Sequence, residues 1–267
     1  MTRATAPIVL TDRDKQLLEY MFRFRLLNRD QIMALAHFNS LTRANTRLAK
    51  LVKARLLSRK QTPVVPGHGG AQALYHLAPA SVGVLNADPS AIIAQSRQAS
   101  RWDLRQMDHV ITANQVLVDF LSAVNRLPET QMLSFRTEPE LRRAFLAQPL
   151  VPDGWFAWTD QGKRFNCFIE VDLAHEGLTQ WRKKVLDYLT YAESGLHQEV
   201  FSFRSFRVLV IALGARRLDG LRRTSEHADR FFLFAQLGEI NAQTILGAAW
   251  LPVLGSDRVS LTGGPSK

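Results

Sequence analysis

Residues 41–57 carry two adjacent stripes that constrain the fold more than any other feature of the sequence. An apolar stripe follows the i, i+4, i+7 spacing of one helix side, at Ala44, Leu48 and Leu51. A basic stripe repeats this spacing one residue earlier, at Arg43, Arg47 and Lys50. Residues 41–60 contain seven basic residues and no acidic residue. This pattern predicts a helix that packs with one side and presents polar and basic side chains with the other.

The segments around this helix predict a small domain in residues 1–85. Two further helical patterns precede it, and each begins with a capping residue, Thr11 and Asn28. Gln31 follows Asn28 at the spacing of a capping box. After the third helix, two short strands flank a Gly/Pro-rich loop over residues 63–70, which is typical of a β-hairpin. Three helices followed by a hairpin indicate a winged helix.

The third helix of a winged helix enters the major groove of double-stranded DNA, and the hairpin contacts the phosphate backbone. We therefore expect the hairpin to place Arg59, Lys60 and His68 near phosphates. The residues expected to face DNA from the third helix are Thr42, Arg43, Asn45, Thr46, Arg47 and Lys50. The alternative is a helical protein–protein module, because many domains of this type serve that purpose.

Charge segregation favours DNA over that alternative. The net charge of the chain is +10, and residues 1–76 hold 13 Lys and Arg against 4 Asp and Glu, a net charge of +9. The other 191 residues are nearly neutral, with 21 basic and 20 acidic residues. A basic module attached to a neutral one indicates a polyanionic partner for the first module.

Composition excludes several other classes of protein. No apolar run approaches the length of about 18 residues that spans a bilayer. The first ten residues lack the features of a signal peptide, so we expect a cytoplasmic protein without a membrane partner. The single cysteine, Cys167, excludes an intramolecular disulfide framework and cysteine-rich zinc sites.

The rest of the chain predicts an α+β or α/β domain over residues 101–255. A linker rich in Ala, Ser and Gln is expected before it, at 86–100, and a disordered tail after it, at 256–267. The expected elements, in order, are a helix at 101–126, strands at 131–137, 155–159 and 164–172, a helix at 178–193 and a strand at 206–213. In the third strand, residues alternate so that one face is apolar and the other ends in Glu170 and Asp172.

This αβββαβ order resembles the core of the PD-(D/E)XK nuclease superfamily, whose relatives include restriction endonucleases. The resemblance implies that Asp153, in the turn Pro152-Asp153-Gly154, and Glu170 would be catalytic acids. Asp172 occupies the place of the usual lysine. Lys184 shares a helix side with Gln180 and Tyr188, at i, i+4 and i+8, and it is the candidate substitute for that lysine.

The whole arrangement resembles the replication-relaxation family of plasmids and integrative elements. The likeness runs from residue 10 to about residue 213 and is carried by the order of its stretches, Leu10–Asp14, Leu41–Leu57, Tyr75–Leu77, Asp108–Asn114, Pro152–Gly154, Phe168–Asp172, Arg182–Lys184 and Tyr188. It implies a DNA-binding accessory of a mobile element in replication initiation, transfer or transcriptional control. Replication or transfer proteins of that element would then be partners.

Two functions stay open at this level. In one, the protein binds DNA without cutting it, needs no cofactor, and its acidic residues are a turn former and a solvated strand end. In the other, it is a Mg²⁺-dependent deoxyribonuclease in which Asp153, Glu170 and Asp172 hold the metal and Lys184 stabilises phosphate charge. The missing lysine on the third strand favours the first.

A homodimer is also expected, with residues 231–234 as a candidate contact or a core strand.

Overall fold

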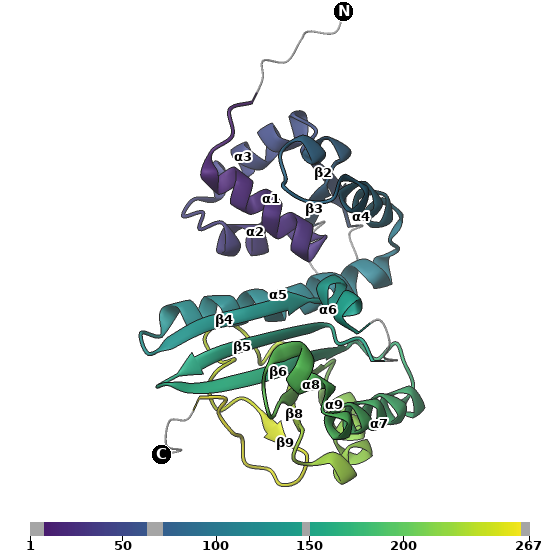
Figure 1. Ribbon diagram of the computed structural model, residues 1–267. Coiled ribbons are helices and arrows are strands. Elements are labelled where there is room, and N and C mark those ends of the chain that lie inside the picture. Colours follow the sequence, from purple (N-terminus) through teal and green to yellow (C-terminus); the bar gives the residue numbers. More distant parts are fainter. Residues whose placement is uncertain (1–7, 63–71, 146–149, 263–267) are drawn as a thin grey trace, which may run out of the picture. The chain divides into compact units, whose positions relative to one another are not determined.

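The structure is a computed structural model that describes residues 8–62, 72–145 and 150–262 (Figure 1). The fold is mixed α+β, as expected, and the chain divides into two compact units, Met1–Asn114 and Gln115–Lys267. Unit 1 contains a three-stranded sheet and unit 2 a six-stranded sheet.

Unit 1 begins with helices and short strands in an order that agrees with the three helices and hairpin predicted from the sequence. Its sheet has the strand order β1-β3-β2, and both pairings are antiparallel. The elements are α1 (Asp12–Phe24), β1 (Leu27–Asn28), α2 (Arg29–Leu35), α3 (Leu41–Lys53), β2 (Leu57–Gln61) and β3 (Ala73–Leu77). The loop between β2 and β3, which includes His68, lies largely outside the described residues.

The first two helices begin where the sequence predicted, because side chains satisfy their free backbone N–H groups. Thr11 N donates to Asp14 Oδ2 at 2.7 Å, and Asp14 N donates back to Thr11 Oγ1 at 3.3 Å. Asn28 and Gln31 make the same reciprocal pair at 3.0 and 2.8 Å. The third helix ends at Lys53, earlier than predicted, since Leu57 already belongs to β2.

Residues 86–100, which composition predicted to be a linker, are mostly helical. The short 3-10 helix η1 (Pro79–Gly83) leads to α4 (Pro89–Arg101), and Asp88 caps α4 by accepting from Ser90 N at 3.0 Å. Ala99 of α4 packs in a buried cluster with residues from three other segments. These are Leu26 in the loop after α1, Leu74 of β3, and Trp102 and Met107, which follow α4 in the chain. The linker prediction was therefore wrong, because a small apolar face on this helix is enough to bury it in unit 1.

Unit 2 is built on the sheet order β4-β5-β6-β7-β8-β9. Strands β4, β5 and β6 form an antiparallel meander, β7 and β8 continue parallel to β6, and β9 pairs antiparallel with β8. The elements are α5 (Leu104–Arg126, which begins in unit 1), β4 (Thr130–Thr137), α6 (Glu138–Ala144), β5 (Gly154–Asp160), β6 (Lys163–Asp172), α7 (Leu178–Ser194), α8 (Leu196–Phe201), β7 (Arg207–Ala212), α9 (Ala215–Thr224), η2 (Glu226–Ala228), β8 (Phe232–Gln236) and β9 (Leu251–Pro252).

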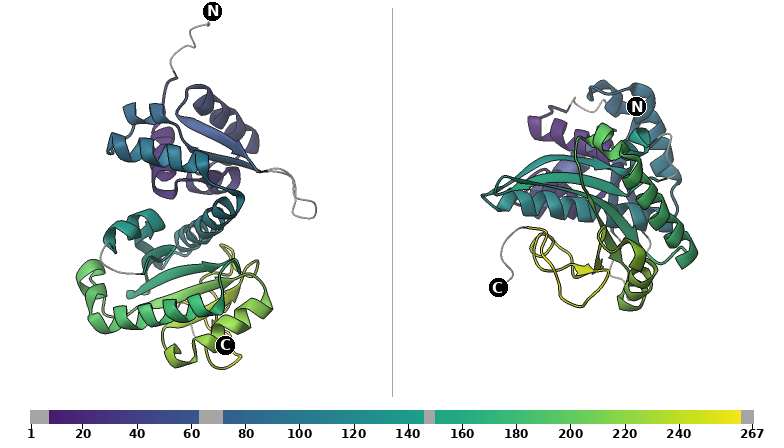
Figure 2. Two further views of the ribbon diagram at one scale, coloured as in Figure 1. Left: turned by 90° about the vertical axis from the view of Figure 1, so that its right-hand side faces the viewer. Right: turned by 60° about the horizontal axis from the view of Figure 1, so that its bottom comes forward.

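Helices cover both faces of this sheet (Figures 1 and 2). On one face, Phe168 of β6 packs in the main core cluster with residues of α7 and α9, among them Trp181, Tyr188 and Leu221. On the other face, the ring of Phe120 in α5 lies 3.5 Å, between centroids, from that of Phe156 in β5. The two-residue alternation of β6 thus sorts its side chains between the two layers, as predicted.

The structure decides between the two alternatives for residues 231–234 and corrects the extent of the tail. Residues 231–234 belong mostly to strand β8 between β7 and β9, where Phe232 and Phe234 are fully buried, so the core strand is confirmed over the dimer contact. The predicted tail is ordered as far as residue 262. Val259 pairs with Trp250, and Leu261 is buried, because these apolar side chains continue the core of unit 2.

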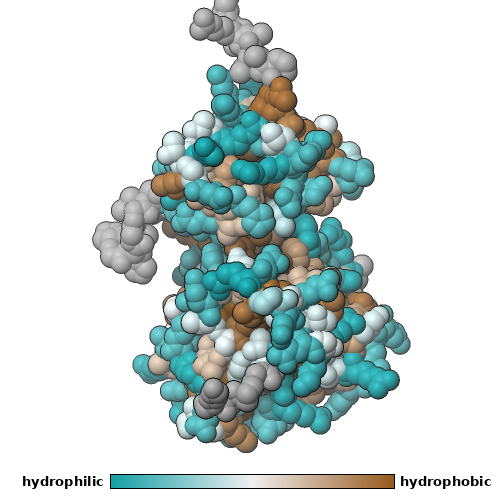
Figure 3. Space-filling view, turned by 90° about the vertical axis from the view of Figure 1, so that its left-hand side faces the viewer, coloured by the Kyte–Doolittle hydropathy of each residue, from teal (hydrophilic) through white to brown (hydrophobic). Residues whose placement is uncertain are grey.

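The surface is largely polar on the face drawn in Figure 3, with smaller hydrophobic areas between the hydrophilic ones. Within the described parts of the chain, no helix combines the length and the apolar character that crossing a membrane requires.

Candidate nucleic-acid interface and acidic cluster

Helix α3 presents the outward polar side that its two stripes predicted. Its apolar stripe is fully buried, at Ala44, Leu48 and Leu51. On the opposite side Thr42, Arg43, Asn45, Thr46 and Lys50 are exposed. Ser40 Oγ caps the helix by accepting from Arg43 N at 3.4 Å. No ion pair of Arg43 or Lys50 occurs within the described residues, so both cations are available to a ligand.

Arg47 lies in a different environment from the other basic residues of α3. Its Nε donates to Asp14 Oδ1 at 2.7 Å, its Nη2 donates to Asp14 Oδ2, and the same Nη2 donates to Val9 O at 2.8 Å. The Asp14 side chain is only 1% exposed. Burial acts to raise the pKa of Asp14, but the hydrogen bonds from Arg47 and Thr11 outweigh it and lower that pKa. Arg47 thus joins α3 to the start of α1, and its expected contact with DNA stays a prediction.

The hairpin residues also divide into two environments. Arg59 is exposed on β2, as expected for a phosphate contact. Lys60 is partly buried, and its Nζ donates to Trp102 O at 2.8 Å and to Ser100 O at 3.4 Å, at the C-terminal end of α4. A cation there is stabilised by the unpaired carbonyls of the helix end. Lys60 therefore holds α4 on the hairpin, and its expected contact with phosphate stays a prediction.

In unit 2, Asp153 immediately precedes β5 and is fixed to β6. Its backbone N donates to Ile169 O at 3.0 Å, and its Oδ2 accepts from Val171 N at 2.8 Å. The carboxylate of Asp153 consequently lies beside the last residues of β6, where the sequence placed the second candidate acid.

Glu170 of β6 points at helix α7 and is 2% exposed. Lys184 Nζ donates to Glu170 Oε2 at 2.7 Å, and Tyr188 OH donates to Oε1 at 2.6 Å. Burial raises the pKa of Glu170, while Lys184 opposes that rise and the nearby charge of Asp153 adds to it. The pKa of Lys184 is raised by Glu170 and Asp153, which outweigh the effect of its own burial. The structure thus brings Asp153, Glu170 and Lys184 into one electrostatically coupled group.

Asp172, the third candidate metal ligand, is held elsewhere. Arg217 of α9 donates to both of its carboxylate oxygens at 2.7 Å, and Ala174 N donates to Oδ1 at 2.9 Å. Among residues 8–62, 72–145 and 150–262, no three His, Cys, Asp or Glu side chains form a group suited to a metal ion. The expected metal set of Asp153, Glu170 and Asp172 is therefore corrected, because a guanidinium already neutralises Asp172.

A family model described as "Replication-relaxation" matches residues 18–203, which is more than half of the chain. The chain belongs to the replication-relaxation family. The matched region includes α3 and the group formed by Asp153, Glu170 and Lys184, and it ends before Arg217. Comparison with curated proteins finds no significant match.

One side of α7 presents Gln180, Lys184 and Tyr188, but only the last two contact Glu170. Gln180 is exposed, and its Oε1 accepts from Gly177 N at 2.7 Å at the start of the helix. Lys184 and Tyr188, one and two turns further on, reach Glu170. The helical spacing was therefore a sound guide to Lys184 and Tyr188, while the capping demand of the first turn took Gln180 away.

Sequence reasoning missed Arg217 and the role of Arg47. The partner of Arg217, Asp172, lies 45 positions away in the chain, and that of Arg47, Asp14, lies 33 positions away. No periodicity within one element signals such pairs. One signal in the sequence could have pointed to the partner of Arg47. The capping box of Thr11 and Asp14 holds the Asp14 carboxylate against the helix, and a buried carboxylate needs a nearby cation.

Proposed function

We propose that this protein binds double-stranded DNA through α3 of unit 1 and acts as an accessory or regulator of a plasmid or integrative mobile element. The observation that carries the proposal is the outward side of α3, where Thr42, Arg43, Asn45, Thr46 and Lys50 are exposed without an acidic neighbour on the helix. Arginine and asparagine are the side chains that pair in bidentate fashion with guanine and adenine in the major groove.

The framework around α3 supports this proposal. The order α1-β1-α2-α3-β2-β3, with a β1-β3-β2 antiparallel sheet, fits a winged helix. In that arrangement the third helix enters the major groove and the hairpin follows the phosphate backbone. Arg59 on β2 is then a backbone contact. The net charge of +9 over residues 1–76 supplies the long-range attraction.

Unit 2 fits a core like that of restriction endonucleases, and we propose that it does not cleave DNA. The order α5, β4, β5, β6, α7, β7, into which the short helices α6 and α8 are inserted, and the parallel pairing of β6 with β7 support the resemblance. The donor set does not suit Mg²⁺ as it stands. Both oxygens of Glu170 accept from Lys184 and Tyr188, and Asp172 is paired with Arg217. We therefore assign no cofactor to the protein.

Membership in the replication-relaxation family suggests the replication or transfer of a mobile element as the setting. Within it we propose replication initiation, transfer or transcriptional control, with replication or transfer proteins of the element as partners.

A metal-dependent nuclease is the second candidate, because Lys184 does point at Glu170 beside Asp153. This is the position that a displaced catalytic lysine would need. The same contacts are also those of a structural ion pair that joins a strand to a helix. Because the carboxylates are already occupied, the structural ion pair is favoured over the nuclease.

The decisive experiment measures binding and cleavage with the full chain. Duplexes selected from a random library are titrated at several salt concentrations, and the affinity is expected to fall steeply with salt. The variant Arg43→Ala/Lys50→Ala should lose most of this affinity, and Arg216→Ala, which removes an exposed arginine of α9, should not. The proposal would be overturned if the affinity for every duplex depended neither on the salt concentration nor on the Arg43 and Lys50 side chains of α3.

Cleavage is measured on the same duplexes and on supercoiled plasmid with Mg²⁺ or Mn²⁺. We expect none. Cleavage that disappears in both Asp153→Ala and Lys184→Ala would establish the nuclease instead.

A further inference from the structure

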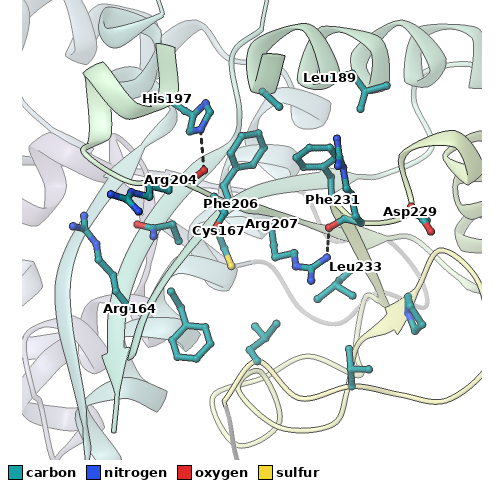
Figure 4. A pocket seen from close by; sticks show the side chains of 18 of the residues that line it. Arg164, Cys167, Leu189, His197, Arg204, Phe206, Arg207, Asp229, Phe231 and Leu233 are labelled. Carbon is teal, nitrogen blue, oxygen red and sulfur yellow. Dashed lines mark hydrogen bonds between the residues drawn. The ribbon is translucent and has the colours of Figure 1, made fainter. Parts of the chain in front are cut away.

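Unit 2 contains a second candidate site, a cavity of about 870 Å³, that neither the proposed DNA-binding surface nor the acidic cluster uses (Figure 4). It lies where the parallel strands begin, and its lining includes Asn166 and Cys167 of β6, Arg207 of β7 and Leu233 of β8. Glu170 and Asp172 lie nearer the other end of β6 and do not line it. The volume is typical of a site for a small organic ligand.

The lining of the cavity is basic. Four arginines, Arg164, Arg204, Arg207 and Arg230, face two acids, Glu193 and Asp229, which gives a net charge of +2. Unit 2 as a whole is close to neutral, since residues 115–267 hold 18 Lys and Arg against 17 Asp and Glu, a net charge of +1. This local excess of arginine favours an anionic ligand.

Several donors of these arginines remain free for a ligand. Arg204 is exposed, and its side chain makes no hydrogen bond or ion pair within the described residues. Arg164 makes two long hydrogen bonds, at 3.3 Å to Ser202 O and 3.4 Å to Phe201 O. Arg207 donates through Nη1 to Arg230 O. Figure 4 shows Arg164 and Arg204 on the same side of the view of the cavity. A phosphate group is the anion that such forked donors bind best.

Three buried polar atoms around the same cavity have no hydrogen-bond partner among the described residues. They are Asn166 Oδ1, His197 Nδ1 and Trp158 Nε1. The side chains are 8%, 4% and 0% exposed, respectively. Such a buried polar atom normally finds a partner, because leaving it unpaired is costly. Asn166 and His197 lie on the α7 side of the sheet, where a ligand with polar edges can supply the missing bonds. Trp158 packs against Phe120 on the α5 side and does not contribute to such a site.

Aromatic rings form the remaining walls. The rings of Trp158 and Phe165 are stacked, with centroids 5.0 Å apart and an interplanar angle of 17°. Phe165 and Phe231 are partly exposed, so each keeps some ring surface for a ligand. Flat heterocyclic bases stack on such rings.

We propose that this cavity binds a nucleotide, with its phosphate at Arg164 and Arg204 and its base near Asn166 and Phe231, which lie on the α7 side of the sheet. The arginines account for the phosphate, the unpaired polar atoms on that side for the hydrogen-bonding edge of the base, and the Phe231 ring for one of its faces. The nucleotide is either a free nucleoside phosphate or the phosphate-bearing end of a DNA strand. The proposal does not depend on the DNA-binding function of unit 1.

The test uses calorimetric titration of the full chain carrying Arg43→Ala/Lys50→Ala, so that binding through α3 does not contribute. The probes are ATP, ADP, AMP, adenosine and a 5′-phosphorylated tetrathymidylate. We expect one site for at least one phosphorylated probe and much weaker binding of adenosine. Adding Arg204→Ala should weaken binding about tenfold. Adding Arg216→Ala, an exposed arginine outside the cavity, should leave it unchanged.

The outcomes separate the two sources of the nucleotide. Binding of the mononucleotides assigns a free nucleotide, and binding of the oligonucleotide alone assigns a strand end. Arg204→Ala should leave the thermal unfolding temperature unchanged, since its side chain has no partner in the described structure. Absence of binding for every phosphorylated probe, or binding that is indifferent to both Arg204→Ala and Asn166→Ala, would overturn the proposal.

Discussion

Lys184 Nζ lies 2.7 Å from Oε2 of Glu170, and this ion pair joins helix α7 to strand β6 inside unit 2. Tyr188, one turn further along α7, donates to the other carboxylate oxygen at 2.6 Å. The Glu170 carboxylate is nearly removed from water, so its charge depends on these two donors. The same pair is the feature on which the nuclease alternative rests, and its structural contribution can be measured separately.

Lys184→Met should destabilise the protein by about 2 kcal/mol or more, because it leaves a buried carboxylate without its cation. The lost cation also lets burial raise the pKa of Glu170 further. A raised carboxyl pKa means that the folded state holds more protons, so stability falls as pH rises. The defect should therefore be larger at about pH 8 than at about pH 5 in urea unfolding.

The matched control for Lys184 is its neighbour Lys183, which is exposed. Lys183→Met should change stability by no more than about 0.5 kcal/mol. Adding Glu170→Gln to Lys184→Met should recover part of the loss, since the unpaired charge is then gone. Equal losses in Lys183→Met and Lys184→Met would show that the ion pair contributes nothing.

Arg47→Ala should lower the stability of unit 1 by about 2–3 kcal/mol, because Asp14 is left buried without its guanidinium. Asp14 has a lowered pKa, so its stabilisation is complete above the ordinary carboxyl pKa and is lost as pH falls through the lowered value. Without Arg47, the loss of stability on acidification should be shallower than in the natural protein. Denaturant unfolding from about pH 6 down to about pH 2 measures this. A variant as stable as the natural protein at neutral pH would contradict the assignment.

Sequence patterns predicted the elements of this fold better than the partners of its charged side chains. The capping residues Thr11 and Asn28, the buried stripe of α3 and the alternation in β6 all depend on neighbours within a few residues, and each was correctly placed. Local periodicity records these relationships directly. It placed Lys184 on the correct side of α7 for the same reason.

The partners of Arg47, Lys60 and Asp172 could not be predicted in this way. Each pairs with a residue more than thirty positions away, and only packing between elements brings the two together. A basic stripe on a helix is compatible with DNA contact at every position, so Arg43 and Arg47 were assigned the same role. The linker prediction failed similarly, since Ala99 is buried by residues from elsewhere in unit 1, Leu26 and Leu74 among them.

Arg43 and Arg59 should affect DNA binding in different ways. Arg43 is exposed on α3, so Arg43→Ala should relax the preference for one base pair and cost about 1–3 kcal/mol on the preferred duplex only. Arg59 is exposed on the hairpin, so Arg59→Ala should weaken all duplexes alike and reduce the salt slope by about one. Competitive binding to a duplex library at two salt concentrations checks both. Uniform loss with both variants would show that α3 does not read bases.

Asp119 of α5 should make unit 2 less stable at alkaline pH. Its side chain is 8% exposed, and burial raises its pKa to about 6, although Gln115 Nε2 donates to it at 3.0 Å. The folded state therefore retains a proton that the unfolded state releases, and stability declines as pH rises from the ordinary carboxyl value through about 6. Asp119→Asn should raise stability at about pH 8 by on the order of 1 kcal/mol and give no gain at about pH 4. Asp108→Asn, at an exposed position of the same helix, is the control for urea unfolding at both pH values. A gain of equal size at both pH values would mean that a neutral side chain fits better there and that the charge of Asp119 is not responsible.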